Sequence, residues 1–137
     1  MAAVHQRKQV VDILVVDDEA RARRALRALL ATYPAVSVVA EAGNGADAIA
    51  CAEATRPSVV LMDVHMPVMD GLEATRQIKR DHPEIAVLLI TIDSAAEVAA
   101  RAAGADDFLL KGLPGGDLVT AILGRVQSRP SVSGTLR

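Results

Sequence analysis

The sequence predicts an α/β protein in which a sheet of five parallel strands lies between two layers of helices. Short apolar runs alternate five times with segments of helical periodicity, and this alternation is typical of βαβ units with right-handed crossovers. The apolar runs are nearly continuous, which indicates a sheet covered by helices on both faces. The chain has 137 residues, a length that fits one domain. We therefore expect a three-layer α/β/α sandwich.

The first part of the pattern contains two strands and two helices. We expect the first strand over residues 12–16, where an aliphatic run begins the alternation. The helix after it, over 19–32, repeats apolar residues on one face. A valine-rich strand over 36–40 leads through a Gly-Asn-Gly turn into a helix over 45–55, which ends before Pro57.

The middle of the chain contributes two more apolar runs, at 58–62 and 86–91, which predict the third and fourth strands. A helix is expected between them over 71–81, after a loop that contains Pro67 and Gly71. Proline fixes φ, and glycine permits backbone conformations closed to other residues. We interpret this loop as scaffold for a site at the end of the third strand.

The fourth helix has recognisable ends. We expect it over residues 95–103, with Ser94 and Glu97 as a capping box at its start. Gly104 is then suited to stop the helix at its C-terminus.

The last strand and helix are followed by a tail. The strand is expected over 106–110, and the helix over 114–127, with Pro114 suited to its first turn. Residues 128–137 contain Ser, Pro, Gly and Thr with little apolar periodicity, which predicts a linker or flexible tail. The domain itself is therefore expected over 10–127.

Composition excludes several classes of protein. Aromatic residues make up 1% of the chain, only Tyr33 and Phe108, so a stacking platform for single-stranded nucleic acid is not expected. The formal net charge of -2 argues against a basic nucleic-acid-binding domain. The single cysteine, Cys51, excludes an intrachain disulfide and a multi-cysteine metal site.

Membrane insertion and secretion are not expected either. No apolar run approaches the roughly 20 residues of a membrane span. Residues 1–11 lack the apolar core of a signal peptide. We expect a cytoplasmic protein that binds neither nucleic acid nor membrane through this domain.

Polar residues follow or close four of the predicted strands: Asp17 and Asp18, Asp63, Thr91 and Lys111. In an open parallel sheet, the carboxyl ends of the strands meet in one crevice, where such sheets bind ligands. Clustered carboxylates repel one another and need protons or a cation to coexist at neutral pH. A site with few carboxylates, phosphate and water suits Mg²⁺. The sequence therefore predicts a magnesium site at this edge.

The motifs around these residues resemble the receiver domain of bacterial two-component response regulators. Two segments, Glu41-Ala42-Gly43-Asn44-Gly45 and Leu61-Met62-Asp63-Val64, are most similar to the NarL/FixJ type. The resemblance implies a doubly wound, flavodoxin-like sheet with strand order 2-1-3-4-5. The matching segments are Val15-Val16-Asp17-Asp18, Leu61-Met62-Asp63-Val64-His65-Met66-Pro67-Val68-Met69-Asp70-Gly71, Leu89-Ile90-Thr91 and Phe108-Leu109-Leu110-Lys111.

The resemblance assigns roles to the residues of the crevice. Asp63 matches the phosphoacceptor, a carboxylate nucleophile that forms an acyl phosphate. Asp18 and Asp63 match the direct Mg²⁺ ligands, and Asp17 a ligand that acts through water. The backbone carbonyl of His65 matches a further ligand. Lys111 matches the lysine that contacts the phosphoryl group.

Thr91 and Phe108 resemble the switch pair of the family. The threonine hydroxyl moves toward the phosphoryl group, and the aromatic ring rotates into the space that it leaves. Phosphorylation adds roughly 1.5 to 2 negative charges, enough to bias such a two-state element. The expected output surface comprises the helix 95–103, the strand 106–110 and the helix 114–127.

Some positions depart from the common pattern or flank the site. Gly112 stands where many receivers have proline, so a cis-proline is not inferred. Ile92 stands where many have a small residue, and its bulk is expected to narrow access. His65 and Asp93 either flank the mouth as a charge-assisted pair that tunes phosphoryl lifetime, or are simply exposed side chains.

Two helices carry surface patterns with two interpretations each. The helix 19–32 bears arginines that either dock an acidic patch of a kinase or form a solvated face, namely Arg21, Arg23, Arg24 and Arg27. The helix 114–127 bears a wide apolar stripe that is either a contact surface or a well-buried face, namely Leu118, Val119, Ile122, Leu123 and Val126.

The resemblance implies a signalling receiver that takes phosphoryl from a sensor histidine kinase and promotes its own phosphoryl transfer and dephosphorylation, without being an enzyme otherwise. Homodimers are expected through the output surface or through the first and fifth helices. The output is expected to be transcription control through a DNA-binding domain absent from this chain. The alternative is a stand-alone receiver that acts by protein–protein contact or phosphorelay.

Two rival functions fit the same scaffold. An aspartyl-phosphate phosphohydrolase typically needs a second acid two residues after its nucleophile, where this chain has His65. That rival would also leave Asp17 and Asp18 unexplained. A binding module that is never phosphorylated would keep the fold, but the complete acidic set counts against it.

Overall fold

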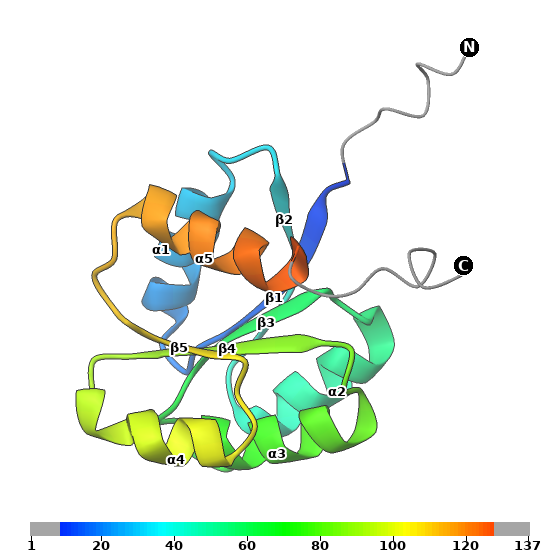
Figure 1. Cartoon of the computed structure of the whole chain (residues 1–137), viewed down its shortest axis with the longest axis vertical. Helices are drawn as coiled ribbons and strands as arrows, with labels where there is room; N and C mark the ends of the chain where they lie inside the picture. Colours follow the sequence, from blue (N-terminus) through cyan, green and yellow to red (C-terminus); the bar gives the residue numbers. More distant parts are fainter. Residues whose placement is uncertain (1–8, 128–137) are drawn as a thin grey trace.

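The computed structural model describes residues 9–127 and contains a five-stranded parallel sheet in the order β2-β1-β3-β4-β5 (Figure 1). This order confirms the predicted doubly wound topology. The strands lie close to the predicted segments and are β1 (Val11–Val16), β2 (Val36–Ala42), β3 (Val59–Asp63), β4 (Ala86–Thr91) and β5 (Asp107–Leu110). The tail expected over 128–137 lies outside the described residues.

Helices cover both faces of the sheet, with α1 and α5 on one face and α2, α3 and α4 on the other (Figure 1). A short 3-10 turn, η2 (Ser94–Ala96), precedes α4. The helices are α1 (Ala20–Leu30), α2 (Gly45–Thr55), α3 (Gly71–Asp81), α4 (Glu97–Ala102) and α5 (Gly115–Gln127).

The sheet separates two aliphatic cores because successive side chains of a strand point to opposite faces. In β1, Ile13 and Val15 pack toward α1 and α5, whereas Leu14 and Val16 pack toward α2 and α3. All four side chains are buried. The near-continuous apolar runs of the sequence are thereby explained, since both faces of each central strand are covered.

The register of the central strands brings their carboxyl ends to one edge. Val16 of β1 lies opposite Met62 of β3, and Asp63 lies opposite Ile90 of β4. Asp63 is therefore the last residue of β3 and Thr91 the last of β4.

Gly71 holds the loop after β3 against the sheet. Its amide donates to the Val64 carbonyl at 2.7 Å. A Cβ atom at this position would lie 2.2 Å from the Asp63 carbonyl oxygen, a distance too short for any residue with a side chain. Asp70 caps α3 by accepting from the Glu73 amide at 2.9 Å, so the helix begins where the loop reaches the sheet.

The capping box predicted from Ser94 and Glu97 is wrong. Asp93 caps the segment instead, and its Oδ1 accepts from the Ala95 amide at 3.0 Å. The first turn is 3-10, so Ser94 lies inside it and α4 starts after Ala96, which makes no side-chain cap. The predicted end of the helix is confirmed, because Gly104 follows α4 with φ of 101°.

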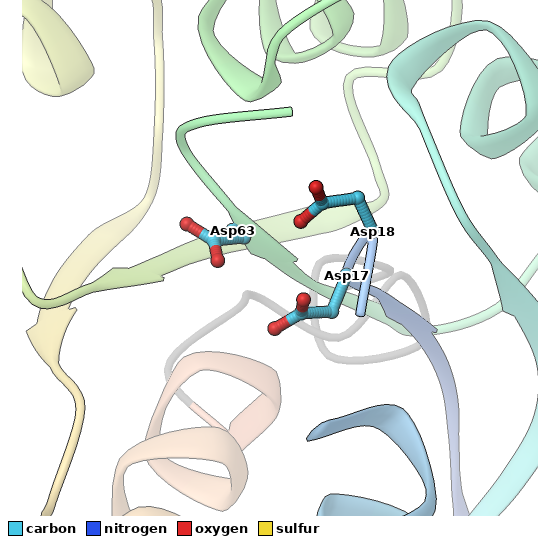
Figure 2. A group of neighbouring side chains, drawn as sticks. All are labelled: Asp17, Asp18 and Asp63. Carbon is cyan, nitrogen blue, oxygen red and sulfur yellow. The ribbon is translucent and has the colours of Figure 1, made fainter. Parts of the chain in front are cut away.

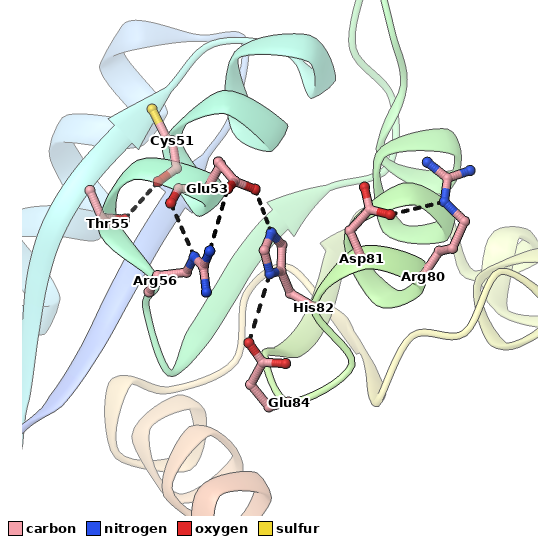
Figure 3. A network of polar contacts seen from close by, with 8 residues as sticks. All are labelled: Cys51, Glu53, Thr55, Arg56, Arg80, Asp81, His82 and Glu84. Atoms are coloured by element: carbon pink, nitrogen blue, oxygen red, sulfur yellow. Dashed lines mark hydrogen bonds and ion pairs between the residues drawn. The ribbon is translucent and has the colours of Figure 1, made fainter.

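A polar network joins the C-terminal ends of α2 and α3 (Figure 3). His82 Nε2 lies 2.7 Å from Glu53 Oε1, and His82 Nδ1 lies 3.8 Å from Glu84 Oε2. The hydrogen bond from His82 holds the pKa of Glu53 below its ordinary value. Both helices lead from here into the starts of strands, so this network lies at the edge of the sheet opposite Asp63.

Candidate functional site

Three carboxylates meet at the carboxyl edge of the sheet. Asp17 and Asp18 follow β1, Asp63 ends β3, and one carboxylate oxygen of each lies within 4.8 Å of the others (Figure 2). Asp17 and Asp63 are buried, whereas Asp18 is exposed to solvent. The sequence prediction that these residues converge is therefore confirmed by the geometry.

Lys111 joins the carboxylates from the end of β5. Its Nζ donates to Asp63 Oδ2 at 2.8 Å and to Asp17 Oδ2 at 3.0 Å. Partial burial alone would lower the pKa of the Lys111 ammonium, but the hydrogen bonds and charges of Asp63 and Asp17 outweigh it and raise the pKa. One ammonium against three carboxylates leaves an excess of negative charge at the edge.

The donor set fits Mg²⁺. It offers only carboxylate oxygens, which hard divalent cations prefer, and its excess negative charge calls for a cation. Both Asp17 oxygens already accept hydrogen bonds, from the Glu19 amide at 2.9 Å and from Lys111. Both Asp63 oxygens also accept hydrogen bonds, from the His65 amide and from Lys111. Asp18, whose exposed carboxylate accepts none within residues 9–127, is therefore the carboxylate most open to a metal.

Thr91 lies at the same edge, but its hydroxyl has another partner. The side chain is buried at the end of β4, and Oγ1 accepts from the Asp93 amide at 3.2 Å. Phe108 of β5 lies opposite Leu89 of β4 and is half-buried against the core formed with α2, α3 and α4. The structure thus places the two residues on neighbouring strands.

The mouth of the site is bridged by a side-chain pair. His65 Nε2 lies 2.9 Å from Asp93 Oδ2, so the two side chains pair as the first sequence interpretation expects, and both are also exposed, as the second expects. The hydrogen bond from His65, together with that from the Ala95 amide, holds the pKa of Asp93 below its ordinary value. Ile92 is 83% exposed, so its side chain stands in solvent beside this bridge.

Sequence reasoning missed a pair of residues behind the site. Arg23 donates from Nη1 to the Asp17 carbonyl at 2.6 Å, and its Nε lies 3.4 Å from Glu41 Oε1. Arg27 pairs with the same glutamate. The other two arginines of α1, Arg21 and Arg24, are exposed. Only the chain's tertiary structure brings Glu41 of β2 to α1, so no local signal marks it.

The remaining features belong to the packing. The stripe on α5 is mostly core, because Leu118, Val119 and Ile122 are buried and its other members pack against the same cluster. Burial, followed by the charge of Asp47, raises the pKa of the Cys51 thiol. None of the helices formed by residues 9–127 has the length and hydrophobicity needed to cross a bilayer.

Comparison with protein families gives a match to the response regulator receiver domain over residues 13–123. Among curated proteins, the chain is 39% identical over 114 residues to the response regulator protein VraR of Staphylococcus aureus, covering 82% of this chain and 54% of that protein. The chain therefore spans about half the length of the curated relatives that it matches.

Solved structures show the same architecture. A LuxR-family two-component response regulator from an Aurantimonas species is 32% identical, with a TM-score of 0.82 over 91% of both chains. The signal receiver domain of NarL from Mycobacterium tuberculosis is 32% identical, with a TM-score of 0.83 over 88% of this chain and 99% of that one. A DNA-binding LuxR-family regulator from Staphylococcus aureus is 27% identical, with a TM-score of 0.79 over 85% and 99%.

Proposed function

This chain belongs to the response regulator receiver domain family, and we propose that Asp63 is its phosphoacceptor, charged by a sensor histidine kinase. The observation that carries the proposal is the contact of Lys111 with Asp63 and Asp17, beside the carboxylate of Asp18. An ammonium, a nucleophilic carboxylate and an acidic metal site are the groups that transfer of a phosphoryl group to a carboxylate requires.

In this reaction a carboxylate oxygen of Asp63 attacks the phosphorus of a phosphohistidine. The new P–O bond forms as the P–N bond breaks, and the leaving imidazole nitrogen takes a proton. Asp18 and Asp63 would hold Mg²⁺, with Asp17 acting through water and the His65 carbonyl as a further ligand; when bound, Mg²⁺ neutralises charge on the transferring oxygens. Lys111 moves its hydrogen bond from the free carboxylate to a phosphoryl oxygen.

The output follows from Thr91 and Phe108. The Thr91 hydroxyl leaves the Asp93 amide for the phosphoryl group, and Phe108 turns into the space released. The surface of α4, β5 and α5 then changes its population between two packings. The domain also promotes its own dephosphorylation, since the same site can admit water in line with the phosphorus.

Partners and location form part of the proposal. Relatives that share this fold include a DNA-binding regulator, which favours control of transcription through a DNA-binding domain over a stand-alone role in protein contact or phosphorelay. Homodimers form through the surface of α4, β5 and α5 or through α1 and α5. Between α1 and the segment that joins β5 to α5 there is an open cleft of about 280 Å³ with largely aliphatic walls. Such a regulator works in the cytoplasm beside its kinase.

Incubation of the chain with acetyl phosphate and Mg²⁺, followed by intact mass measurement, tests the proposal. One added phosphoryl group is expected, and Asp63→Asn should abolish it. Asp12→Asn is the matched control, because Asp12 is an exposed carboxylate at the other end of β1. Labelling that persists in Asp63→Asn would contradict the assignment, and steady turnover of a phosphate ester would favour a phosphohydrolase.

A further inference from the structure

Asp17 is anchored at each of its polar atoms. Its amide donates to the Ala42 carbonyl at 3.1 Å, and its carboxylate oxygens accept from Glu19 and Lys111. Its carbonyl oxygen accepts from Arg23 Nη1 at 2.6 Å. Ala42 belongs to β2, Glu19 to the loop before α1 and Lys111 to the site itself. Arg23 is the one partner that belongs to α1.

Asp18 has no comparable anchor. Its carboxylate is exposed and accepts no hydrogen bond from any residue in the described range 9–127. The backbone therefore sets the direction of the Asp18 Cα–Cβ bond, from which the unanchored carboxylate extends. The peptide plane that joins Asp17 to Asp18 includes the carbonyl that Arg23 binds, so Arg23 controls the orientation of this plane.

Arg23 is itself held in place. Its Nε lies 3.4 Å from Glu41 Oε1, with side-chain exposures of 22% and 23%. Arg27 occupies the other oxygen of the same carboxylate. The glutamate fixes the guanidinium and offsets its charge near a site that must accept a cation.

We propose that Arg23, oriented by Glu41, is a positioning residue that aligns Asp18 for metal binding through the Asp17 carbonyl. This inference rests on the proposed function, because it assumes that Asp18 binds Mg²⁺. Arg23 touches neither metal nor phosphoryl group, and it acts only through the backbone.

Charge alone predicts the opposite behaviour, which makes the test sharp. Removal of a cationic side chain near an acidic site strengthens the binding of Mg²⁺ by simple electrostatics. Loss of a positioning contact weakens it. Arg27 provides a matched control, because it lies one turn away on α1, pairs with the same Glu41 carboxylate and makes no contact with Asp17.

Calorimetric titration of the whole chain with Mg²⁺, without a phosphoryl donor, measures the effect. Arg23→Gln should weaken binding about tenfold, which is the lower end of the effect expected for loss of one hydrogen bond to a charged donor. Arg27→Gln should bind as the wild type does, or more tightly. Arg23→Lys should recover part of the loss, since an ammonium can still donate to the carbonyl.

A second readout needs no metal. In amide NMR spectra of the Mg²⁺-free protein, Arg23→Gln should shift the Asp18 amide, which shares the peptide plane with the Asp17 carbonyl, and Arg27→Gln should not. Equal or tighter Mg²⁺ binding in Arg23→Gln, equal weakening in both variants, or an unmoved Asp18 amide would overturn the inference. Failure of the wild type to bind Mg²⁺ would instead contradict the proposed metal site.

Discussion

Nε2 of His65 lies 2.9 Å from Oδ2 of Asp93, so a side chain of the loop after β3 meets one of the loop after β4. Both residues also touch the functional groups beside them. The His65 amide donates to Asp63 Oδ1 at 3.2 Å, and the Asp93 amide donates to the Thr91 hydroxyl at 3.2 Å. One chain of contacts thus links the proposed phosphoacceptor to the proposed switch.

This bridge predicts a longer phosphoryl lifetime than an open site would have. His65→Ala removes the bridge and admits water in line with the phosphorus, so the half-life should fall about fivefold, which is ~1 kcal/mol of barrier. Ile92→Ala should shorten it less, because that side chain stands in solvent. Decay of phosphoprotein after removal of the donor, at fixed Mg²⁺, measures both. A half-life that is unchanged or longer in His65→Ala would show that the pair does not limit access.

Mg²⁺ should stabilise the fold through Asp18. A ligand that binds only the native state raises the free energy of unfolding as its concentration rises. Asp18→Ala should remove this effect, and should raise stability without metal because it relieves repulsion among carboxylates. Thermal melts across a Mg²⁺ titration provide the measurement, with Asp12→Ala as the control. Identical Mg²⁺ responses of the wild type and Asp18→Ala would exclude this site.

Gly71 should tolerate no side chain. A Cβ would meet the Asp63 carbonyl oxygen at 2.2 Å, so Gly71→Ala should destabilise the protein by about 3 kcal/mol through forced displacement of the backbone. Gly124→Ala is the control of opposite sign. It lies within α5 with nothing within 4 Å of the added atom, and should stabilise by about 0.5–1 kcal/mol. Urea unfolding of both variants measures these changes. An unchanged free energy of unfolding in Gly71→Ala would contradict the prediction.

Activation should reach the surface of α4, β5 and α5. Beryllofluoride with Mg²⁺ mimics the phosphorylated carboxylate, and amide NMR shifts should extend from Asp63 to Phe108 and α4. Thr91→Ala should confine the shifts to the immediate site, because the hydroxyl that would hydrogen-bond the phosphoryl group is missing. Thr120→Ala, with its exposed hydroxyl on α5, is the control. Shifts restricted to the site in the wild type would rule out this route.

Acid should weaken the contact between α2 and α3. The pKa of Glu53 is lowered in the folded state by the hydrogen bond from His82, so the unfolded state binds a proton more readily. The stabilisation is present above the ordinary glutamate pKa of about 4.3 and disappears as pH falls through the lower folded value. Glu53→Gln should therefore flatten the loss of stability on acidification in urea unfolding. Glu84→Gln, whose carboxylate lies 3.8 Å from the ring, should follow the wild type.

The sequence, with the family resemblance, was sufficient to predict the fold and which charged residues lie together. Apolar runs mark the parallel strands, and the edge at which such strands end is fixed by their direction. Asp18, Asp63 and Lys111 could therefore be predicted from the sequence to lie together, although they are far apart in the chain. Helix limits were predicted well where a cap or glycine marks them, as at Gly104.

Contacts between distant side chains could not be predicted. The pairing of Arg23 with Glu41 depends on how α1 packs against the end of β2, which no local pattern encodes. The start of α4 was misjudged because a 3-10 turn capped by Asp93 replaces the expected α-helical turn. Val68 adopts φ of 71°, a conformation that its β-branched side chain disfavours, so propensity gave no warning of it.

The position of β3 in the middle of the sheet has a mechanical consequence. All of its residues are buried, whereas β5 is an edge strand with half-buried and exposed residues and α4 has only 6 residues. Native proteins open locally where little apolar surface is buried. We therefore expect the edge strand that carries Phe108 to open more readily than the central strand that carries Asp63. In the proposed function, a rigid central strand would hold the phosphoacceptor while a more easily deformed surface at the edge of the sheet changes conformation, so that switching would not require the core to unfold.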